Sequence, residues 1–246
     1  MKNRHVTIGA DTVIKRFDDV SWAHAEQMSY DRLSRIVVNL PLSNGWALRA
    51  PKVLRTTPTE IEMERVPGLA LNQIIREGQP IPWWQIGEAL AFFHKRSGGT
   101  LAKKPLYSDI GVGNILISPT AKEISFIDPG VNFGTIGPVT QDVLMVLWAI
   151  FSARLRHRRT LRYAESQFLE GYNSILEDSE IKEFVQLLSD QAGLNATRSK
   201  LYDRWKRPTM RHKAGRLSFA VWSSLVYRIL VLTEIQELGA NTMSPR

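Results

Sequence analysis

The side chains best suited to chemistry stand together between Tyr107 and Gly130, in the sequence YSDIGVGNILISPTAKEISFIDPG. Asp109 and Asn114 are five positions apart across a glycine-containing segment, and Asp128 follows the second of two short apolar runs. Carboxylate and amide oxygens are ligands for a hard divalent cation, and a carboxylate is also a general base. These residue types therefore indicate a cation site with a base beside it.

A β-hairpin is the element that would bring these three side chains to one edge. The runs 115–117 and 124–127 are apolar, and the sequence Ser-Pro-Thr at 118–120 predicts the turn between them. Each polar residue taken alone has a simpler interpretation, because Asp and Asn commonly cap turns. The three together, in this order, favour the functional interpretation.

Strands are expected early in the chain and helices late. Apolar and polar residues alternate at 5–8 and 12–17, with Lys15 in the second run, and a helix at 21–38, capped by Ser21, carries Glu26. Further strands are expected at 46–49 and 60–66, and helices at 69–77, 83–97, 140–155, 163–175, 179–188, 197–206 and 214–238. This order predicts an α+β fold with a short β-rich N-terminal lobe, residues 1–66, and a mainly helical C-terminal lobe, residues 67–246.

The composition is that of a globular protein with a basic surface. Of the residues, 43% are hydrophobic and 23% charged, and the absence of cysteine excludes disulfides and thiolate metal sites. The first residues contain no apolar signal segment, and no apolar run is long enough to span a membrane, so a cytoplasmic location is expected. The net charge of +8 indicates an anionic partner, with a solvated basic surface as the alternative.

The order of these motifs resembles the protein-kinase-like fold. It is closest to the branch of small-molecule phosphotransferases, such as the aminoglycoside, choline and lipopolysaccharide kinases. The catalytic loop of that family, H-x-D-x-x-x-x-N, precedes a hydrophobic strand and an I-D-x-G motif, and Asp109, Asn114 and the sequence Ile-Asp-Pro-Gly at 127–130 match these parts. The resemblance covers roughly residues 5–150. It implies a two-lobed kinase that uses ATP and Mg²⁺.

The resemblance also implies a role for each matching residue. Asp109 would be the catalytic base that accepts the proton of an acceptor hydroxyl, and Asn114 and Asp128 would be Mg²⁺ ligands. Lys15 and Glu26 resemble the ion pair that holds the α- and β-phosphates of ATP. A lysine at an exposed strand edge, taken alone, is as readily a solvated charge.

Two further positions come from the same resemblance. The segment 62–68 resembles the hinge of the phosphotransferases, in which the backbone around Glu64 and Val66 would meet the adenine edge of ATP. Asp142 resembles the structural aspartate that accepts hydrogen bonds from the catalytic-loop backbone. A carboxylate in the first turn of a helix is also favoured by the helix dipole, and the two interpretations are compatible.

The sequence departs from the family pattern at three places, and one of them is the acceptor loop, which matches no substrate class. Tyr107 stands where the family has histidine, and no G-x-G-x-x-G loop precedes Lys15, since only Gly9 lies upstream. These departures leave two further hypotheses open, a catalytically inactive kinase-like binding module and a kinase that needs a partner to complete its nucleotide lid. A basic, helical nucleic-acid-binding protein is another interpretation, but it does not explain the segment 107–130.

Two basic clusters in the C-terminal lobe bear on the acceptor. They include Arg154, Arg158, Arg162, Lys206 and Arg207. Kinases of cationic aminoglycosides or choline would be expected to have acidic acceptor pockets, so these clusters favour an anionic acceptor such as a sugar, a lipid-linked sugar or a protein, or a membrane face. The alternative is that both clusters are solvated faces.

Overall fold

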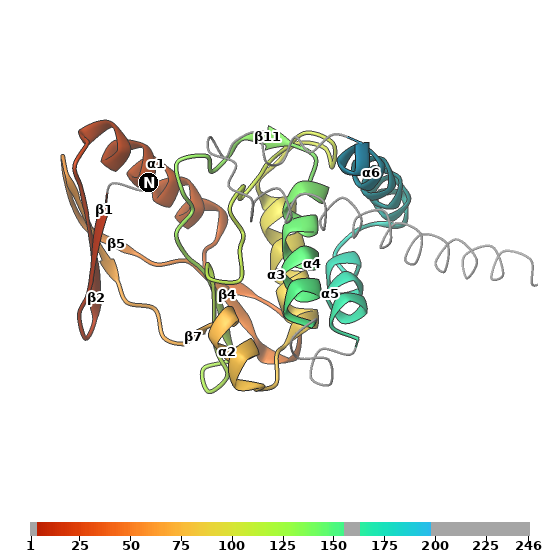
Figure 1. The fold of residues 1–246 in the computed structure, drawn as a ribbon, viewed down its shortest axis with the longest axis horizontal. Helices are drawn as coiled ribbons and strands as arrows, with labels where there is room; N and C mark the ends of the chain where they lie inside the picture. The colour runs from red at the N-terminus through yellow and green to blue at the C-terminus, as the bar shows by residue number, and fades with distance from the viewer. Residues whose placement is uncertain (1–3, 155–162, 198–246) are drawn as a thin grey trace, which may run out of the picture. The chain divides into compact units, whose positions relative to one another are not determined.

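The computed structural model describes residues 4–154 and 163–197 of the chain (Figure 1). Residues 1–176 form one compact unit, and residues 177–246 form a second. Within the described residues, the strands belong to the first unit, and the second unit contains helix α6, Asp178–Thr197. The fold is α+β, with a β-rich N-terminal part followed by helices, as the sequence predicts.

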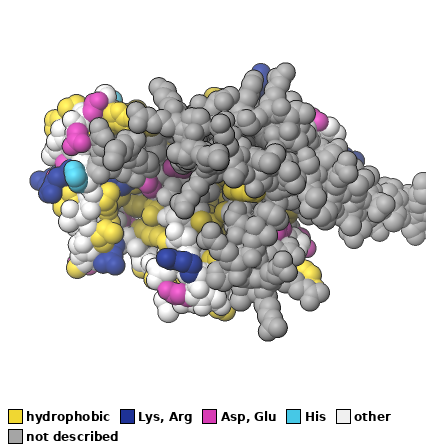
Figure 2. Space-filling model, in the orientation of Figure 1, with side chains coloured by type: hydrophobic (Ala, Val, Ile, Leu, Met, Phe, Trp, Pro, Cys, Tyr) yellow, Lys and Arg dark blue, Asp and Glu magenta, His cyan; other side chains and the backbone are white. Residues whose placement is uncertain are grey.

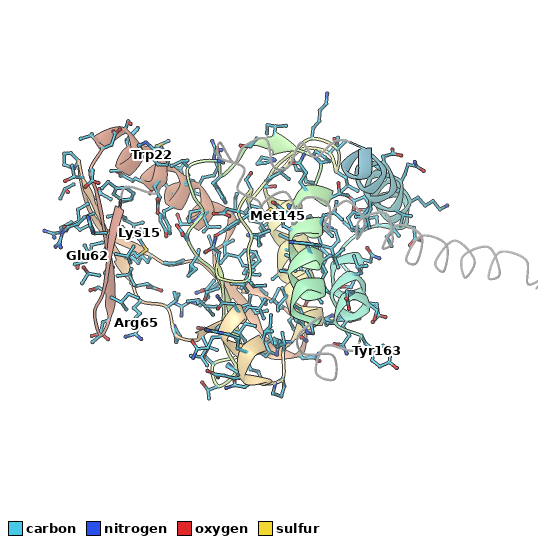
Figure 3. The ribbon with its side chains drawn as sticks, in the orientation of Figure 1. Lys15, Trp22, Glu62, Arg65, Met145 and Tyr163 are labelled. Carbon is cyan, nitrogen blue, oxygen red and sulfur yellow. The ribbon has the colours of Figure 1, made fainter. Side chains whose placement is uncertain are left out.

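The N-terminal part of the first unit is an antiparallel sheet with the strand order β1-β2-β6-β5. These strands are β1 Arg4–Ile8, β2 Thr12–Phe17, β5 Val53–Thr57 and β6 Glu60–Glu64. Both predicted N-terminal strands are confirmed, and they pair with Val6 opposite Lys15. Lys15 and Glu62 lie on opposite sides of this sheet (Figure 3).

Helix α1, Val20–Ile36, packs on this sheet and shares its core. The predicted cap was wrong: Asp19, not Ser21, caps the helix, and its carboxylate accepts a hydrogen bond of 2.7 Å from the backbone N–H of Ser21. The hydroxyl of Ser21 donates to the same carboxylate, and these hydrogen bonds lower the pKa of Asp19. Asp19 suits the cap because it directly precedes the first helical residue, Val20, and its side chain reaches forward to the first free N–H groups.

A second sheet has the order β3-β4-β10-β9-β7 and contains the predicted hairpin. Its strands are β3 Leu40–Pro41, β4 Ala47–Arg49, β7 Leu69–Ala70, β9 Ile115–Ser118 and β10 Glu123–Phe126. β9 and β10 pair antiparallel, from Glu123 opposite Ser118 to Phe126 opposite Ile115. Two short strands pair antiparallel with each other: β8 Lys104–Pro105, which precedes this hairpin in the sequence, and β11 Ile136–Gly137, which follows it.

The helices of the C-terminal part form where the sequence predicts them. They are α2 Leu71–Glu77, α3 Trp83–Arg96, α4 Thr140–Arg154 and α5 Ala164–Asn173. Helix α6 begins near its predicted start and extends beyond the predicted 179–188, while the helices expected at 197–206 and 214–238 lie outside the described residues, apart from Thr197. None of the described helices is both long enough and apolar enough to cross a membrane.

Candidate active site

The loop before β9 and the end of β10 bring Asp109, Asn114 and Asp128 to one edge of the hairpin. The side-chain amide of Asn114 donates to the backbone carbonyl of Asp109 at 2.8 Å. The carbonyl of Asn114 in turn accepts from the N–H of Ile127 at 2.9 Å, which joins the loop to the residue before Asp128. Gly130 also lies beside the loop, because a Cβ at this position would be 3.9 Å from the Asp109 carboxylate.

Two residues of this site have a left-handed backbone conformation that non-glycine residues seldom adopt. The φ angle is 66° at Ser108 and 57° at Asp128. Such conformations cost roughly 1–3 kcal/mol and persist where the surrounding contacts enforce them, often at functional sites. Here they set the direction of the chain directly before Asp109 and at Asp128.

Lys15 connects the first sheet to the hairpin edge. Its side chain is buried, and its ammonium group pairs with the Glu26 carboxylate, donates to the Tyr30 hydroxyl at 2.9 Å and contacts a carboxylate oxygen of Asp128 at 2.9 Å. The structure thus brings together three of the residues selected from the sequence, two from the N-terminal part and one from the hairpin. Because Lys15 is buried, it is not the solvated strand-edge lysine of the alternative interpretation.

Tyr30 is a residue of this cluster that the sequence reasoning missed. Besides Lys15, its hydroxyl meets the backbone N–H of Asp128, which donates to it at 3.3 Å. Burial raises the pKa of Tyr30, which keeps the hydroxyl protonated. A signal was present, because Tyr30 lies four residues after Glu26 and residues at this spacing share one face of a helix.

Tyr107 and Asp142 make hydrogen bonds that hold the backbone of the loop before β9. The carboxylate of Asp142, in the first turn of α4, accepts from the N–H of Tyr107 at 2.7 Å and from the N–H of Ser108 at 2.9 Å. The hydroxyl of Tyr107 donates to the carbonyl of Ile127 at 2.5 Å. Tyr107 is completely buried, and burial raises its pKa well above the usual range, so the phenol remains a donor.

Comparison with solved structures identifies the fold of the chain that carries this site. No family model and no curated protein matches the sequence. Among solved structures, the chain is similar to ADP-bound aminoglycoside phosphotransferase APH(2'')-Ib, with a TM-score of 0.54, 11% identity and coverage of 92% of this chain and 91% of the other. The chain has a protein-kinase-like fold, similar to that of the aminoglycoside phosphotransferases.

Two more solved structures share this kinase-like fold. Aminoglycoside phosphotransferase APH(3'')-Id from Streptomyces rimosus has a TM-score of 0.50 and 12% identity, over 74% of this chain and 90% of that one. The GDP complex of aminoglycoside 2'-phosphotransferase-IIIa has a TM-score of 0.51 and 9% identity, over 90% of this chain and 89% of that one. At such identities the similarity concerns the fold.

Glu64 and Val66, the predicted hinge residues of the kinase-like fold, lie at and just after the end of β6. Glu64 is opposite Thr12, at the other end of β2 from the cluster around Lys15. Its N–H donates to the carbonyl of Lys52 at 2.9 Å, and its carboxylate pairs with Arg49 at 3.0 Å. Val66 is buried. The side chains of these two residues are therefore occupied by an ion pair and by packing, and the backbone N–H of Glu64 is paired within the sheet.

The predicted anionic-binding surface falls mostly outside the described part of the chain. Arg158, Arg162, Lys206 and Arg207 lie there, and Arg154 is described only as the last residue of α4. On the coloured part of the face in Figure 2, basic and acidic side chains stand among hydrophobic ones.

Proposed function

We propose that this chain is an ATP-dependent phosphotransferase that moves the γ-phosphoryl group to a hydroxyl of an acceptor. The observation that carries the proposal is the contact of 2.9 Å between Lys15 and Asp128, because it joins the buried Lys15–Glu26 pair to the hairpin edge that holds Asp109 and Asn114. Phosphoryl transfer depends mainly on positioning and charge neutralisation, and this arrangement supplies a fixed cation, two ligand oxygens and a carboxylate base.

Each of these groups has a task in the proposed reaction. Lys15 binds the α- and β-phosphates of ATP and is itself oriented by Glu26 and Tyr30. The Asp109 carboxylate orients the acceptor hydroxyl and accepts its proton as the acceptor oxygen bonds to the γ-phosphorus, while the bond from that phosphorus to the β–γ bridging oxygen breaks and ADP leaves. The backbone around Glu64 and Val66 contacts the adenine edge, since Glu64 pairs with Thr12, at the far end of β2 from Lys15.

The residues at the hairpin edge suit Mg²⁺, which would be held by Asp128 and Asn114. Asn114 uses its amide nitrogen to hold the Asp109 carbonyl, so its side-chain oxygen is the atom suited to a cation. Mg²⁺ is commonly bound through one or two carboxylates, with phosphate and water completing its coordination. When bound, it would neutralise phosphate charge during transfer.

The acceptor that fits the basic C-terminal sequence is anionic, such as a sugar, a lipid-linked sugar or a protein, and the protein would then work in the cytoplasm, near a membrane face for a lipid-linked acceptor. The clusters that contain Arg154, Arg158, Arg162, Lys206 and Arg207 support this choice, because cationic acceptors would be repelled by them. The bilobal division proposed from the sequence places these clusters in the lobe formed by residues 67–246, the side on which the acceptor binds in this fold.

An inactive, kinase-like binding module is the second candidate. Within the described residues only one strand, β1, lies beyond β2 in the first sheet, so no glycine-rich strand pair covers the phosphate position there. In addition, a carboxylate oxygen of Asp128, a proposed Mg²⁺ ligand, accepts a hydrogen bond from Lys15. An inactive module would bind a nucleotide or a partner without turnover.

Nucleotide binding is tested by thermal unfolding with and without Mg·ATP. A ligand that binds only the folded state at a hundred times its Kd adds about 2.7 kcal/mol of stability, so the unfolding temperature should rise by several degrees. Asp128→Asn keeps the shape of the side chain and should abolish the rise. No rise in the wild type at millimolar Mg·ATP would overturn the proposed function.

Turnover separates the two candidates. Wild-type protein should consume ATP with a hydroxyl acceptor from a panel of sugars, lipid-linked sugars and proteins, and slowly with water. Asp109→Asn should keep the thermal shift and lose turnover by about 10²–10⁴-fold, the usual contribution of a general base. Full activity in Asp109→Asn would exclude Asp109 as the base, and binding without any turnover in the wild type would favour the inactive module.

A further inference from the structure

A buried row of three side chains runs from helix α5 to the catalytic loop. The Tyr172 hydroxyl, on α5, is 2.8 Å from Nδ1 of His94, on α3. Nε2 of the same imidazole is 3.1 Å from the Asp142 carboxylate, on α4. Tyr172 and Asp142 are completely buried and His94 is 1% exposed, so water does not compete for these hydrogen bonds.

The hydrogen-bond pattern fixes which atom donates at each step. The Asp142 carboxylate accepts the N–H groups of Tyr107 and Ser108, so its bond to His94 is one that Nε2–H donates. In a neutral imidazole with the proton on Nε2, Nδ1 is an acceptor, and the Tyr172 hydroxyl donates to it. The Asp142 carboxylate, which only accepts, thus requires this tautomer, and the bond to the Tyr172 hydroxyl holds the imidazole ring in the orientation that turns Nε2–H toward Asp142.

Asp142 needs such support because it holds a strained segment. Ser108 has a left-handed φ of 66°, and its N–H is one of the two that Asp142 accepts. Rotation of the carboxylate away from this position would release the Ser108 N–H, and Asp109 is the next residue. The orientation of the Asp142 carboxylate therefore controls the direction of the Asp109 side chain.

We propose that Tyr172 and His94 are positioning residues, which hold Asp142 in the orientation that fixes the backbone at Tyr107 and Ser108 and so places Asp109. The inference rests on the proposed function only for its effect on phosphoryl transfer. The effect on the loop backbone follows from the hydrogen bonds alone and is measurable without nucleotide.

Four variants isolate the row. Tyr172→Phe removes only the hydroxyl. His94→Gln keeps a side-chain N–H that can reach Asp142, whereas His94→Leu removes the donor. Ser174→Ala is the matched control, because it removes another side-chain hydrogen bond at the end of α5, from the Ser174 hydroxyl to the Gly171 carbonyl at 2.7 Å, without touching the row.

Amide hydrogen exchange of the full chain is the first measurement. In Tyr172→Phe and His94→Leu, exchange at the Tyr107 and Ser108 N–H groups should accelerate by about tenfold, the factor expected when a buried hydrogen-bonding group loses its partner. His94→Gln should stay within about threefold of the wild type, and Ser174→Ala should leave these amides unchanged. Exchange in Tyr172→Phe equal to that in Ser174→Ala, or a uniform acceleration of all amides, would overturn the proposal.

The second measurement separates kcat from ATP affinity. In Tyr172→Phe, kcat for ATP consumption should fall by about tenfold while Kd for Mg·ATP stays within twofold, because only the reacting carboxylate is displaced. A parallel loss of affinity and rate would indicate general destabilisation and contradict positioning. If the wild type neither binds nor consumes ATP, the proposed function fails, and the exchange measurement still decides the role of the row.

Discussion

A tyrosine hydroxyl joins the two halves of the candidate site. Tyr107 belongs to the loop that carries Asp109, and it donates to the carbonyl of Ile127, which precedes Asp128. The family pattern places a histidine at this position, and the sequence predicts only that a tyrosine could replace it by packing and hydrogen bonding. The structure shows a buried phenol that packs edge-on against Phe126 and Phe133 and makes this bond. The tyrosine therefore provides a hydrogen bond between the loop that carries Asp109 and the segment that carries Asp128.

Tyr107→Phe should weaken the protein without altering its fold. The Ile127 carbonyl would lose its donor in a buried place, which costs about 1–3 kcal/mol in the free energy of unfolding. Because the folded-state pKa of Tyr107 lies above its unfolded value of about 10, the wild-type bond contributes below that pH and is lost as pH rises through the folded pKa. Urea unfolding between pH 7 and 11.5 should show a shallower alkaline decline in the variant. Equal slopes for both proteins would contradict this.

Helix α3 approaches helix α5 closely enough for glycine alone to fit at the contact. A Cβ at Gly87 would lie 1.9 Å from the Phe168 carbonyl oxygen, and a Cβ at Gly171 would lie 2.0 Å from the Trp84 carbonyl oxygen. Tyr172 follows Gly171 directly, so this close approach is what brings its hydroxyl within reach of His94.

Gly171→Ala should force the two helices apart. Overpacking of this kind costs about 1–3 kcal/mol, and thermal or urea unfolding would measure it. Gly111→Ala is the control, because a Cβ at Gly111 would meet nothing within 4 Å. The variant should also accelerate amide exchange at Tyr107 and Ser108, since His94 would lose Tyr172. Equal stability of Gly171→Ala and Gly111→Ala would show that the contact between α3 and α5 adjusts to a larger side chain, and would contradict the prediction.

The elements that the sequence predicts well are those with a regular pattern. Strands β1 and β2, the hairpin β9–β10 and helix α3 follow apolar periodicity and clear turn residues, so their residues specify them locally. The two-residue strands β3, β7, β8 and β11 have no such pattern, because their pairing depends on neighbours far along the chain. The roles of His94 and Tyr172 were not predicted for the same reason, because their hydrogen bonds form only when α3, α4 and α5 pack together.

At the scale of the first unit, Arg49 ties the two sheets together. Its guanidinium, at the end of β4 in the second sheet, pairs with Glu64 of β6 in the first sheet at 3.0 Å and with Glu123 of β10 at 3.1 Å. All three side chains are about a quarter exposed, so the pairs are partly shielded from salt. The proposed nucleotide would contact both sheets, and this tie sets their spacing beside the adenine position.

Arg49→Met should weaken Mg·ATP binding because the sheets would no longer be held in register. A loss of roughly threefold to tenfold in affinity corresponds to about 1 kcal/mol, and calorimetric titration would measure it. Arg55→Met is the control, since Arg55 also pairs with two carboxylates, Glu60 and Glu62, but within one sheet. An equal loss in both variants would point to a general effect of charge and contradict the tie.

Position 128 meets two requirements, one from the backbone conformation and one from the proposed chemistry. A library of substitutions can distinguish them. At a φ of 57°, only glycine, asparagine and aspartate are accommodated readily, and β-branched residues least of all. Selection of a saturation library for folded protein should therefore enrich Asp, Asn and Gly at position 128, whereas selection for phosphoryl transfer should retain Asp alone. The difference between the two selected pools would measure what chemistry requires of this residue beyond what folding requires.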